Sequence, residues 1–232
     1  MTNYLNYLNR FYSVDEINPK LNLLYEKYDE IQKEFSENVD KLVWINWGAS
    51  TGYSGHNTTA YDGWKVAALY TEIKDTADLS MSLAIKNLHM FESRYGQKLY
   101  PDFEKKIIMC HNAKYLPTLV DTFYKCGITK RIGISVVYPG KDIKWHTDPD
   151  PEIGNNAIIR GLWGLDVKEK ENKNSYICLG EENDYQKRYF KNNEFIFFWG
   201  RINHKVENTL DSPRYVVCFD QDIDKEYLYN IK

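Results

Sequence analysis

Residues 138–148 read YPGKDIKWHTD, and this stretch decides the fold that the sequence predicts. Its Pro-Gly pair favours a tight turn, because proline fixes φ and glycine accepts the positive φ that such turns need. β-rich residues lie on both sides of the pair, so the pattern predicts two strands joined by a turn. The second strand ends near His146, with Asp148 just beyond it. A strand end holds side chains rigidly, as a metal site requires.

The same arrangement recurs further along the chain. His204 follows an aromatic run at 195–199 that is succeeded by a glycine, which predicts a buried strand and a turn. Arg214 begins another β-rich run, RYVVCF. From Arg131 onward, short β runs alternate with turn residues, a pattern typical of an all-β sandwich or barrel.

The N-terminal half carries both helical and extended signals. Asn18-Pro19 precedes apolar residues at helical spacing, which predicts an amphipathic helix that continues to about Phe35. Residues 43–47 and 64–70 predict strands. The polar stretch 48–59 between them predicts a long loop beside the site, since loops of this length are often functional.

Two more helices are expected, at 79–95 and at 116–126, and Gly127 is placed to end the second. We expect one catalytic domain that spans the whole chain. Within it, residues 1–130 form an elaboration of helices and strands, and residues 131–222 form the β core that carries the site.

The composition excludes several classes of protein. A chain of 232 residues with 43% hydrophobic residues can bury a substantial core. The formal net charge of −3, with dispersed basic residues, gives no footprint for nucleic acid or acidic membranes. Four cysteines without close spacing predict neither a zinc site nor a disulfide framework. No apolar run approaches the ~20 residues that span a bilayer. We therefore expect a cytoplasmic protein without a nucleic-acid or membrane partner.

His146, Asp148 and His204 are the candidate metal ligands. Two imidazoles and one carboxylate form the set that holds non-haem Fe(II) on one face and leaves the opposite positions open. A His-x-Asp pair alone is common by chance, so the assignment depends on the strands that surround it.

Residues 131–222 resemble the catalytic domain of the aspartyl/asparaginyl β-hydroxylase family. These are oxygenases that depend on Fe(II) and 2-oxoglutarate and fold as a double-stranded β-helix, a jelly-roll or cupin-like core. The resemblance implies a mainly β fold with flanking N-terminal helices. The matching fragments have the family's order and spacing: SVVYPG at 135–140, WHTDP at 145–149, IRGLWGL at 159–165, NHKV at 203–206 and the strand that begins at Arg214.

The resemblance also implies roles for individual residues. Arg214 would pair with the C5 carboxylate of 2-oxoglutarate, joined by the hydroxyl of Ser135. Arg160 would contact the C1 carboxylate of 2-oxoglutarate, next to the metal. Asp148 stands where the vertebrate namesakes have Gly, whereas free-amino-acid hydroxylases keep a carboxylate at this position. This carboxylate favours hydroxylation or desaturation over halogenation. Leu162 stands where the namesakes have a His, so one polar contact to the cosubstrate is missing or comes from elsewhere.

We therefore expect a dioxygenase with Fe(II) as cofactor and 2-oxoglutarate and O2 as cosubstrates. It would hydroxylate an unactivated C–H bond of a free amino acid or related small metabolite. An Asp, Asn or other side chain in a peptide or protein is the alternative substrate. A metal-binding cupin that acts as an isomerase, lyase or ligand-binding protein without 2-oxoglutarate is the alternative from another class. The candidate substrate residues are Trp64, Tyr53, His56, Arg131, Arg201 and the loop at 150–152.

Overall fold

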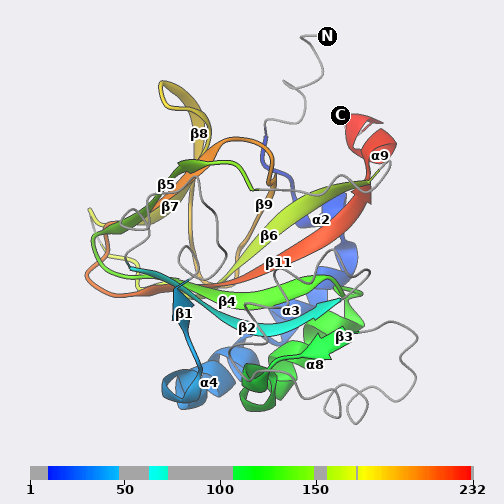
Figure 1. Ribbon diagram of the computed structural model, residues 1–232, viewed down its shortest axis with the longest axis vertical. Helices are drawn as coiled ribbons and strands as arrows, with labels where there is room; N and C mark the ends of the chain where they lie inside the picture. Colours follow the sequence, from blue (N-terminus) through cyan, green and yellow to red (C-terminus); the bar gives the residue numbers. More distant parts are fainter. Residues whose placement is uncertain (1–9, 47–62, 73–106, 149–155, 171, 231–232) are drawn as a thin grey trace.

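The computed structural model describes residues 10–46, 63–72, 107–148, 156–170 and 172–230 of the 232-residue chain. Figure 1 shows two β-sheets facing each other, with helices against the outer side of the larger sheet. The predicted loop at 48–59, helix at 79–95 and loop at 150–152 lie outside the described residues.

The seven-stranded sheet has the order β1-β2-β4-β11-β6-β9, with β3 also paired to β2. The four-stranded sheet has the order β5-β10-β7-β8. All of these pairs are antiparallel. The strands are β1 (Ile45–Asn46), β2 (Trp64–Glu72), β3 (Ile107–Met109), β4 (Arg131–Val137), β5 (Lys141–His146), β6 (Asn156–Asp166), β7 (Ser175–Glu181), β8 (Asp184–Tyr189), β9 (Phe195–Trp199), β10 (His204–Asn208) and β11 (Arg214–Asp224).

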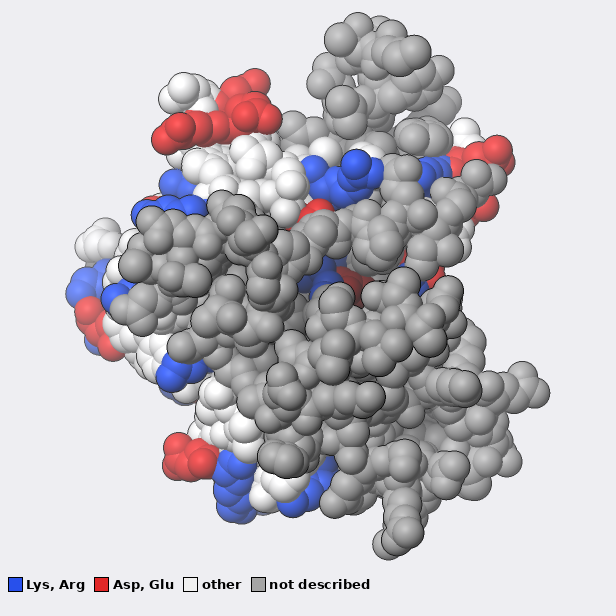
Figure 2. All heavy atoms as spheres, viewed as in Figure 1, with Lys and Arg blue, Asp and Glu red and all other residues white. Residues whose placement is uncertain are grey.

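Short helices precede and flank the sheets. They are α2 (Val14–Ile17), η1 (Pro19–Leu21), α3 (Asn22–Glu26), α4 (Tyr28–Asn38), η2 (Val39–Lys41), η5 (His111–Tyr115), α8 (Pro117–Lys125) and α9 (Lys225–Asn230). Across the described ranges, no helix has both the length and the apolar character needed to cross a membrane. Acidic and basic side chains are interspersed over the described part of the face in Figure 2. The cytoplasmic location and the absence of a nucleic-acid partner stay predictions.

The predicted helix from Asn18 to Phe35 is present in three pieces. The Asn18 side chain accepts a hydrogen bond from the Lys20 backbone N–H, at 3.1 Å, and so caps the first piece. The chain leaves helical geometry at Lys27, where φ is −98° and ψ is 3°, and α4 begins just after it. Ile31 and Phe35 remain buried against the sheet, so the break keeps the apolar face that the spacing predicted.

The helix predicted at 116–126 is α8, and Gly127 follows it at φ +79°. The Gly127 and Ile128 N–H groups donate to the carbonyls of Tyr124 and Phe123, which is the Schellman arrangement for the end of a helix.

Side chains of β11 alternate between two hydrophobic cores, because successive strand residues point to opposite faces. Val217 and Phe219 pack in the core between the larger sheet and the helices. Val216 packs between the two sheets, against residues of the smaller sheet such as Ile177 and Val206. The fold is therefore a mainly β, double-stranded β-helix core with N-terminal helices, which confirms the predicted fold class. Polar residues that share the face of Val216 are directed into the space between the sheets.

Candidate metal centre

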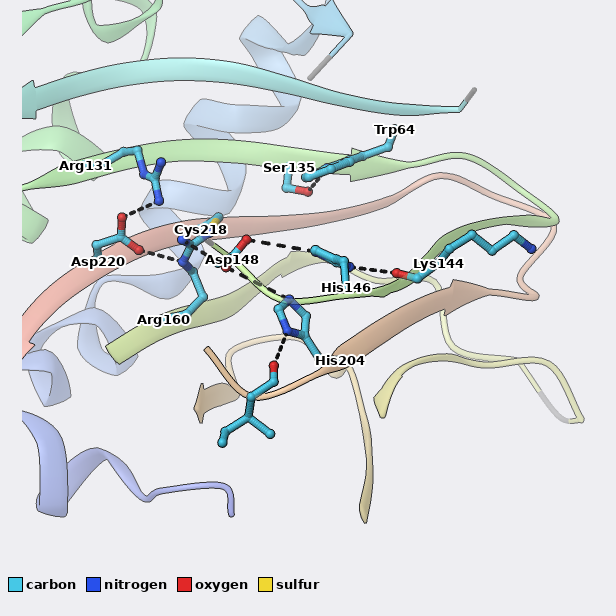
Figure 3. A network of polar contacts seen from close by, with 11 residues as sticks. Trp64, Arg131, Ser135, Lys144, His146, Asp148, Arg160, His204, Cys218 and Asp220 are labelled. Carbon is cyan, nitrogen blue, oxygen red and sulfur yellow. Dashed lines mark hydrogen bonds and ion pairs between the residues drawn. The ribbon is translucent and has the colours of Figure 1, made fainter. Parts of the chain in front are cut away.

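His146, Asp148 and His204 meet between β5 and β10. The two histidines are direct cross-strand partners, and their ring centroids lie 4.2 Å apart. His146 Nε2 lies 3.9 Å from Asp148 Oδ1, and His204 Nε2 lies 4.0 Å from Asp148 Oδ2 (Figure 3). The three ligand atoms all lie within 4.8 Å of one another. Two imidazole nitrogens and a carboxylate oxygen thus converge on one point, as a metal ion requires.

Both imidazoles are held in the tautomer that a metal needs. His146 Nδ1 lies 2.7 Å from the Lys144 carbonyl oxygen, and His204 Nδ1 lies 2.8 Å from that of Ile202. A carbonyl only accepts hydrogen bonds, so each Nδ1 carries the hydrogen and each Nε2 keeps its lone pair for a metal.

A close approach between the segment after β5 and the turn after β9 fixes the backbone of Asp148. The Asp148 N–H donates to the carbonyl of Gly200, at 2.8 Å. A Cβ on Gly200 would lie 3.1 Å from Asp148 Oδ2 and 3.2 Å from its Cβ. The glycine after β9 therefore gives Asp148 room to reach the two histidines.

The charges around the centre prepare it for a cation at neutral pH. Burial alone would raise the pKa of Asp148, but Arg160 and the two histidines lower it to about 2. Burial and the neighbouring His146 lower the pKa of His204 to about 4. Asp148 is therefore an anion and His204 is neutral, the protonation states that ligands require.

Arg160 contacts Asp148 directly. Its Nη2 lies 3.1 Å from Asp148 Oδ2, its Nε lies 2.6 Å from Asp220 Oδ1, and its Nη1 donates to Cys218 Sγ at 3.6 Å. Burial works against the charge on Arg160, but the two carboxylates hold its pKa well above the usual value. The contact with the C1 end of the cosubstrate that the resemblance implies for Arg160 stays a prediction.

Arg214 is a buried cation that faces the space between the sheets. It is 1% exposed, and no carboxylate pairs with it within the described ranges. Its guanidinium carbon lies 4.4 Å from the centre of the Phe190 ring, and its Nε has no hydrogen-bond partner among the described residues. Burial lowers the pKa of Arg214 to about 9. An unpaired buried cation is costly, so this position fits an anionic ligand.

Ser135 lies on the same face of the larger sheet as Arg214. It pairs with Val216 across β4 and β11, while Arg214 pairs with Val137. The Trp64 indole N–H donates to Ser135 Oγ at 2.9 Å. A hydroxyl that accepts one hydrogen bond still carries a hydrogen to donate, so Ser135 is able to bond an anion beside Arg214.

A pocket lies beside the centre. Its lining includes Trp64, Ser135, Arg131, Arg160 and Cys218, with apolar residues of β2 and β4 between them. The pocket therefore reaches from Arg160, which contacts Asp148, to two of the predicted substrate residues, Trp64 on β2 and Arg131 on β4.

The sequence matches the family described as Aspartyl/Asparaginyl beta-hydroxylase over residues 25–222. The chain belongs to this family. The match confirms the resemblance and extends it upstream of the β core. Membership implies a hydroxylase. No curated protein matches the sequence.

The solved structures that match this member of the family share little sequence with it. One is a cupin domain from Bordetella pertussis Tohama I, 11% identical, with a TM-score of 0.28 over 39% of this chain and 80% of that chain. Another is an uncharacterized conserved protein with a double-stranded β-helix domain from Klebsiella pneumoniae. It is 12% identical, with a TM-score of 0.29 over 39% of this chain and 64% of that chain.

The predicted substrate residues of this hydroxylase-family chain have different positions. Trp64 and Arg131 line the pocket, and Arg131 Nη2 lies 2.5 Å from Asp220 Oδ2. Arg201 is exposed in the turn after β9, next to the glycine that contacts Asp148. Tyr53 and His56 lie outside the described residues.

Sequence reasoning missed Asp220 and Gly200. The signal for Asp220 is present in the β11 strand, where Arg214, Cys218 and Asp220 follow the same alternation as Val216. A charged residue on the inward face of a β-helix strand requires a partner there. Gly200 carried no such signal, because its importance depends on a turn that only the folded chain brings close.

Proposed function

We propose that the protein is a 2-oxoglutarate-dependent oxygenase that uses Fe(II) to hydroxylate a C–H bond of a free amino acid or related small metabolite. The observation that carries the proposal is Arg214. A guanidinium that is fully buried, lacks a described carboxylate partner and faces the space between the sheets is suited to a carboxylate of the cosubstrate. A cupin without 2-oxoglutarate has no need of this charge.

The residues present fit the metal that the family implies. His146, Asp148 and His204 would hold Fe(II), since two imidazoles and an ionised carboxylate converge within 4.8 Å. When bound, the iron supplies the activation of O2, with 2-oxoglutarate as the source of electrons.

The chain itself would orient the reactants and exclude water. Arg214 and Ser135 would bind the distal carboxylate of 2-oxoglutarate and so fix its direction from the metal. Phe198 contacts the His204 ring, with centroids 4.8 Å apart, and contributes to the apolar wall behind that ligand. The pocket that reaches Trp64 and Arg131 would hold the substrate beside the centre.

Retention of Asp148 supports the small-molecule version of the substrate. The vertebrate namesakes, which have Gly at this position, contrast with free-amino-acid hydroxylases, which keep the carboxylate. A side chain of a peptide or protein remains the second candidate, because the family's description names aspartyl and asparaginyl residues.

Two measurements test the proposal. Calorimetric titration of the Mn(II)-loaded protein with 2-oxoglutarate should show binding, and succinate release across a panel of amino acids should identify the substrate. Binding of Mn(II) without any binding or turnover of 2-oxoglutarate would favour the cupin alternative. Turnover only with peptides that contain Asp or Asn would select the protein-substrate version.

A further inference from the structure

Four side chains of alternating charge form a ladder that ends on a metal ligand. In order they are Asp148, Arg160, Asp220 and Arg131 (Figure 3). The successive nitrogen–oxygen distances are 3.1, 2.6 and 2.5 Å. Asp220 is 5% exposed, and its two oxygens face different guanidinium groups, Oδ1 that of Arg160 and Oδ2 that of Arg131. Three of the members of this charge ladder lie on neighbouring strands, and Asp148 follows the end of β5.

The sheet register fixes the ladder. Asp220 on β11 is the direct cross-strand partner of Arg160 on β6. On its other side β11 pairs with β4, where Phe219 lies opposite Ile132, so Asp220 lies level with Arg131. Cross-strand neighbours on one face are held about 5 Å apart by the backbone, and their side chains interact. Arg160 therefore has little freedom to move away from Asp220.

We propose that Asp220 is a positioning residue for the metal centre, acting through Arg160 on the carboxylate of Asp148. The proposal rests on the proposed function, in which Asp148 is a ligand to Fe(II). Asp148 follows the end of β5, so its side-chain direction depends on what its oxygens contact. Asp148 Oδ2 lies 3.1 Å from Arg160 Nη2 and 4.0 Å from His204 Nε2. The same oxygen that contacts Arg160 would therefore also face the metal.

Asp220 also limits how strongly Arg160 competes with the metal. Arg160 contacts both carboxylates, with its Nε directed toward Asp220 and its Nη2 toward Asp148. Without Asp220, the buried guanidinium would retain Asp148 as its only close carboxylate among the described residues. It would then draw that carboxylate toward itself and away from the histidines, because a buried cation without its counter-ion is costly.

Metal titration tests the role of Asp220 directly. The Mn(II) affinity of the purified full chain is measured by electron paramagnetic resonance for the wild type, Asp220→Asn and Asp222→Asn. Asp222 is the matched control, since it lies on the same strand and is paired with Lys130. We expect Asp220→Asn to weaken Mn(II) binding about 10- to 100-fold, as loss of a contact that orients a ligand does. The control should stay within about twofold, as for a change away from the site.

A double-mutant cycle separates positioning from general damage. In an Asp148→Ala background, Asp220→Asn should change the remaining Mn(II) affinity by less than about twofold, because its effect is transmitted through the missing carboxylate. An equal loss in both backgrounds, or equal effects of Asp220→Asn and Asp222→Asn, would overturn the proposal. So would unchanged affinity in Asp220→Asn.

Thermal unfolding of the metal-free variants shows whether each one folds. If Asp220→Asn does not fold, Arg160→Lys takes its place, since it keeps the charge and removes the fork that joins Asp148 to Asp220. Wild-type Mn(II) affinity in Arg160→Lys would overturn the proposal. Failure of the proposed metal site itself would look different, because the wild type would then not bind Mn(II) either.

Discussion

Replacing Arg214 by Met should have opposite effects on the stability of the ligand-free protein and on its affinity for 2-oxoglutarate. Arg214 is 1% exposed and has no described carboxylate partner, and such a burial costs on the order of several kcal/mol. Its contact with the Phe190 ring, at 4.4 Å, recovers about 0.5–2 kcal/mol. Met has a similar length and no charge. We therefore expect Arg214→Met to raise the free energy of unfolding by about 1–4 kcal/mol.

The same change should remove most of the affinity for 2-oxoglutarate. Losing one partner of a buried charge pair costs roughly 2–5 kcal/mol. At about 1.4 kcal/mol per tenfold, the Kd of 2-oxoglutarate should rise by roughly 30-fold to several thousand-fold. The stability gained in the free protein and the affinity lost have one cause, because the charge is held in place for the ligand.

Thermal unfolding with and without 2-oxoglutarate, in the presence of Mn(II), measures both effects. For a chain of this size, 1 kcal/mol corresponds to a shift in Tm of about 2–4 °C. A concentration of 2-oxoglutarate that saturates the wild type should raise the Tm of the wild type by more than it raises the Tm of Arg214→Met. Arg188→Met is the control, since Arg188 also lies over an aromatic ring, that of Phe11 at 5.1 Å, but on the exposed strand β8. A variant that is less stable without ligand and binds 2-oxoglutarate like the wild type would refute the reasoning.

Three further predictions concern the metal centre and the fold. His204→Ala and Asp148→Ala should each weaken Mn(II) binding by more than the roughly 10–100-fold typical of a supporting contact; wild-type metal content in His204→Ala would remove it from the ligand set. Gly200→Ala should weaken Mn(II) binding while the unfolding free energy of the metal-free protein changes little, because the new Cβ would lie 3.1 Å from Asp148 Oδ2; unchanged affinity would show that the turn adapts. Gly127→Ala should lower the unfolding free energy by about 1–2 kcal/mol in a urea titration, because φ is +79° there, and should leave Mn(II) affinity unchanged.

The strands and the clustering of the three candidate ligands could be predicted because they depend on local pattern. The Pro-Gly turn places Gly140 at φ +66°, as its sequence implied, and the strands on either side follow from β-rich residues. His146 and His204 lie at strand ends and become direct partners once β5 and β10 pair. The helix break at Lys27 was not predictable from spacing, because apolar periodicity continues through it and packing against the sheet decides where the axis changes.

The surroundings of Arg160 show where local pattern stops being informative. Its position in an apolar strand established that it needed a buried partner, and the resemblance supplied the cosubstrate as one candidate. The choice among partners depends on register, since a strand of given sequence pairs with whichever neighbours the sheet places beside it. In this chain the neighbour is Asp220, whose Oδ1 lies 2.6 Å from Arg160 Nε. A residue outside the motif is therefore linked to Asp148 through Arg160. The candidate ligands can therefore be recognised from short motifs, while the contact of Arg160 with Asp220 depends on the pairing between β6 and β11.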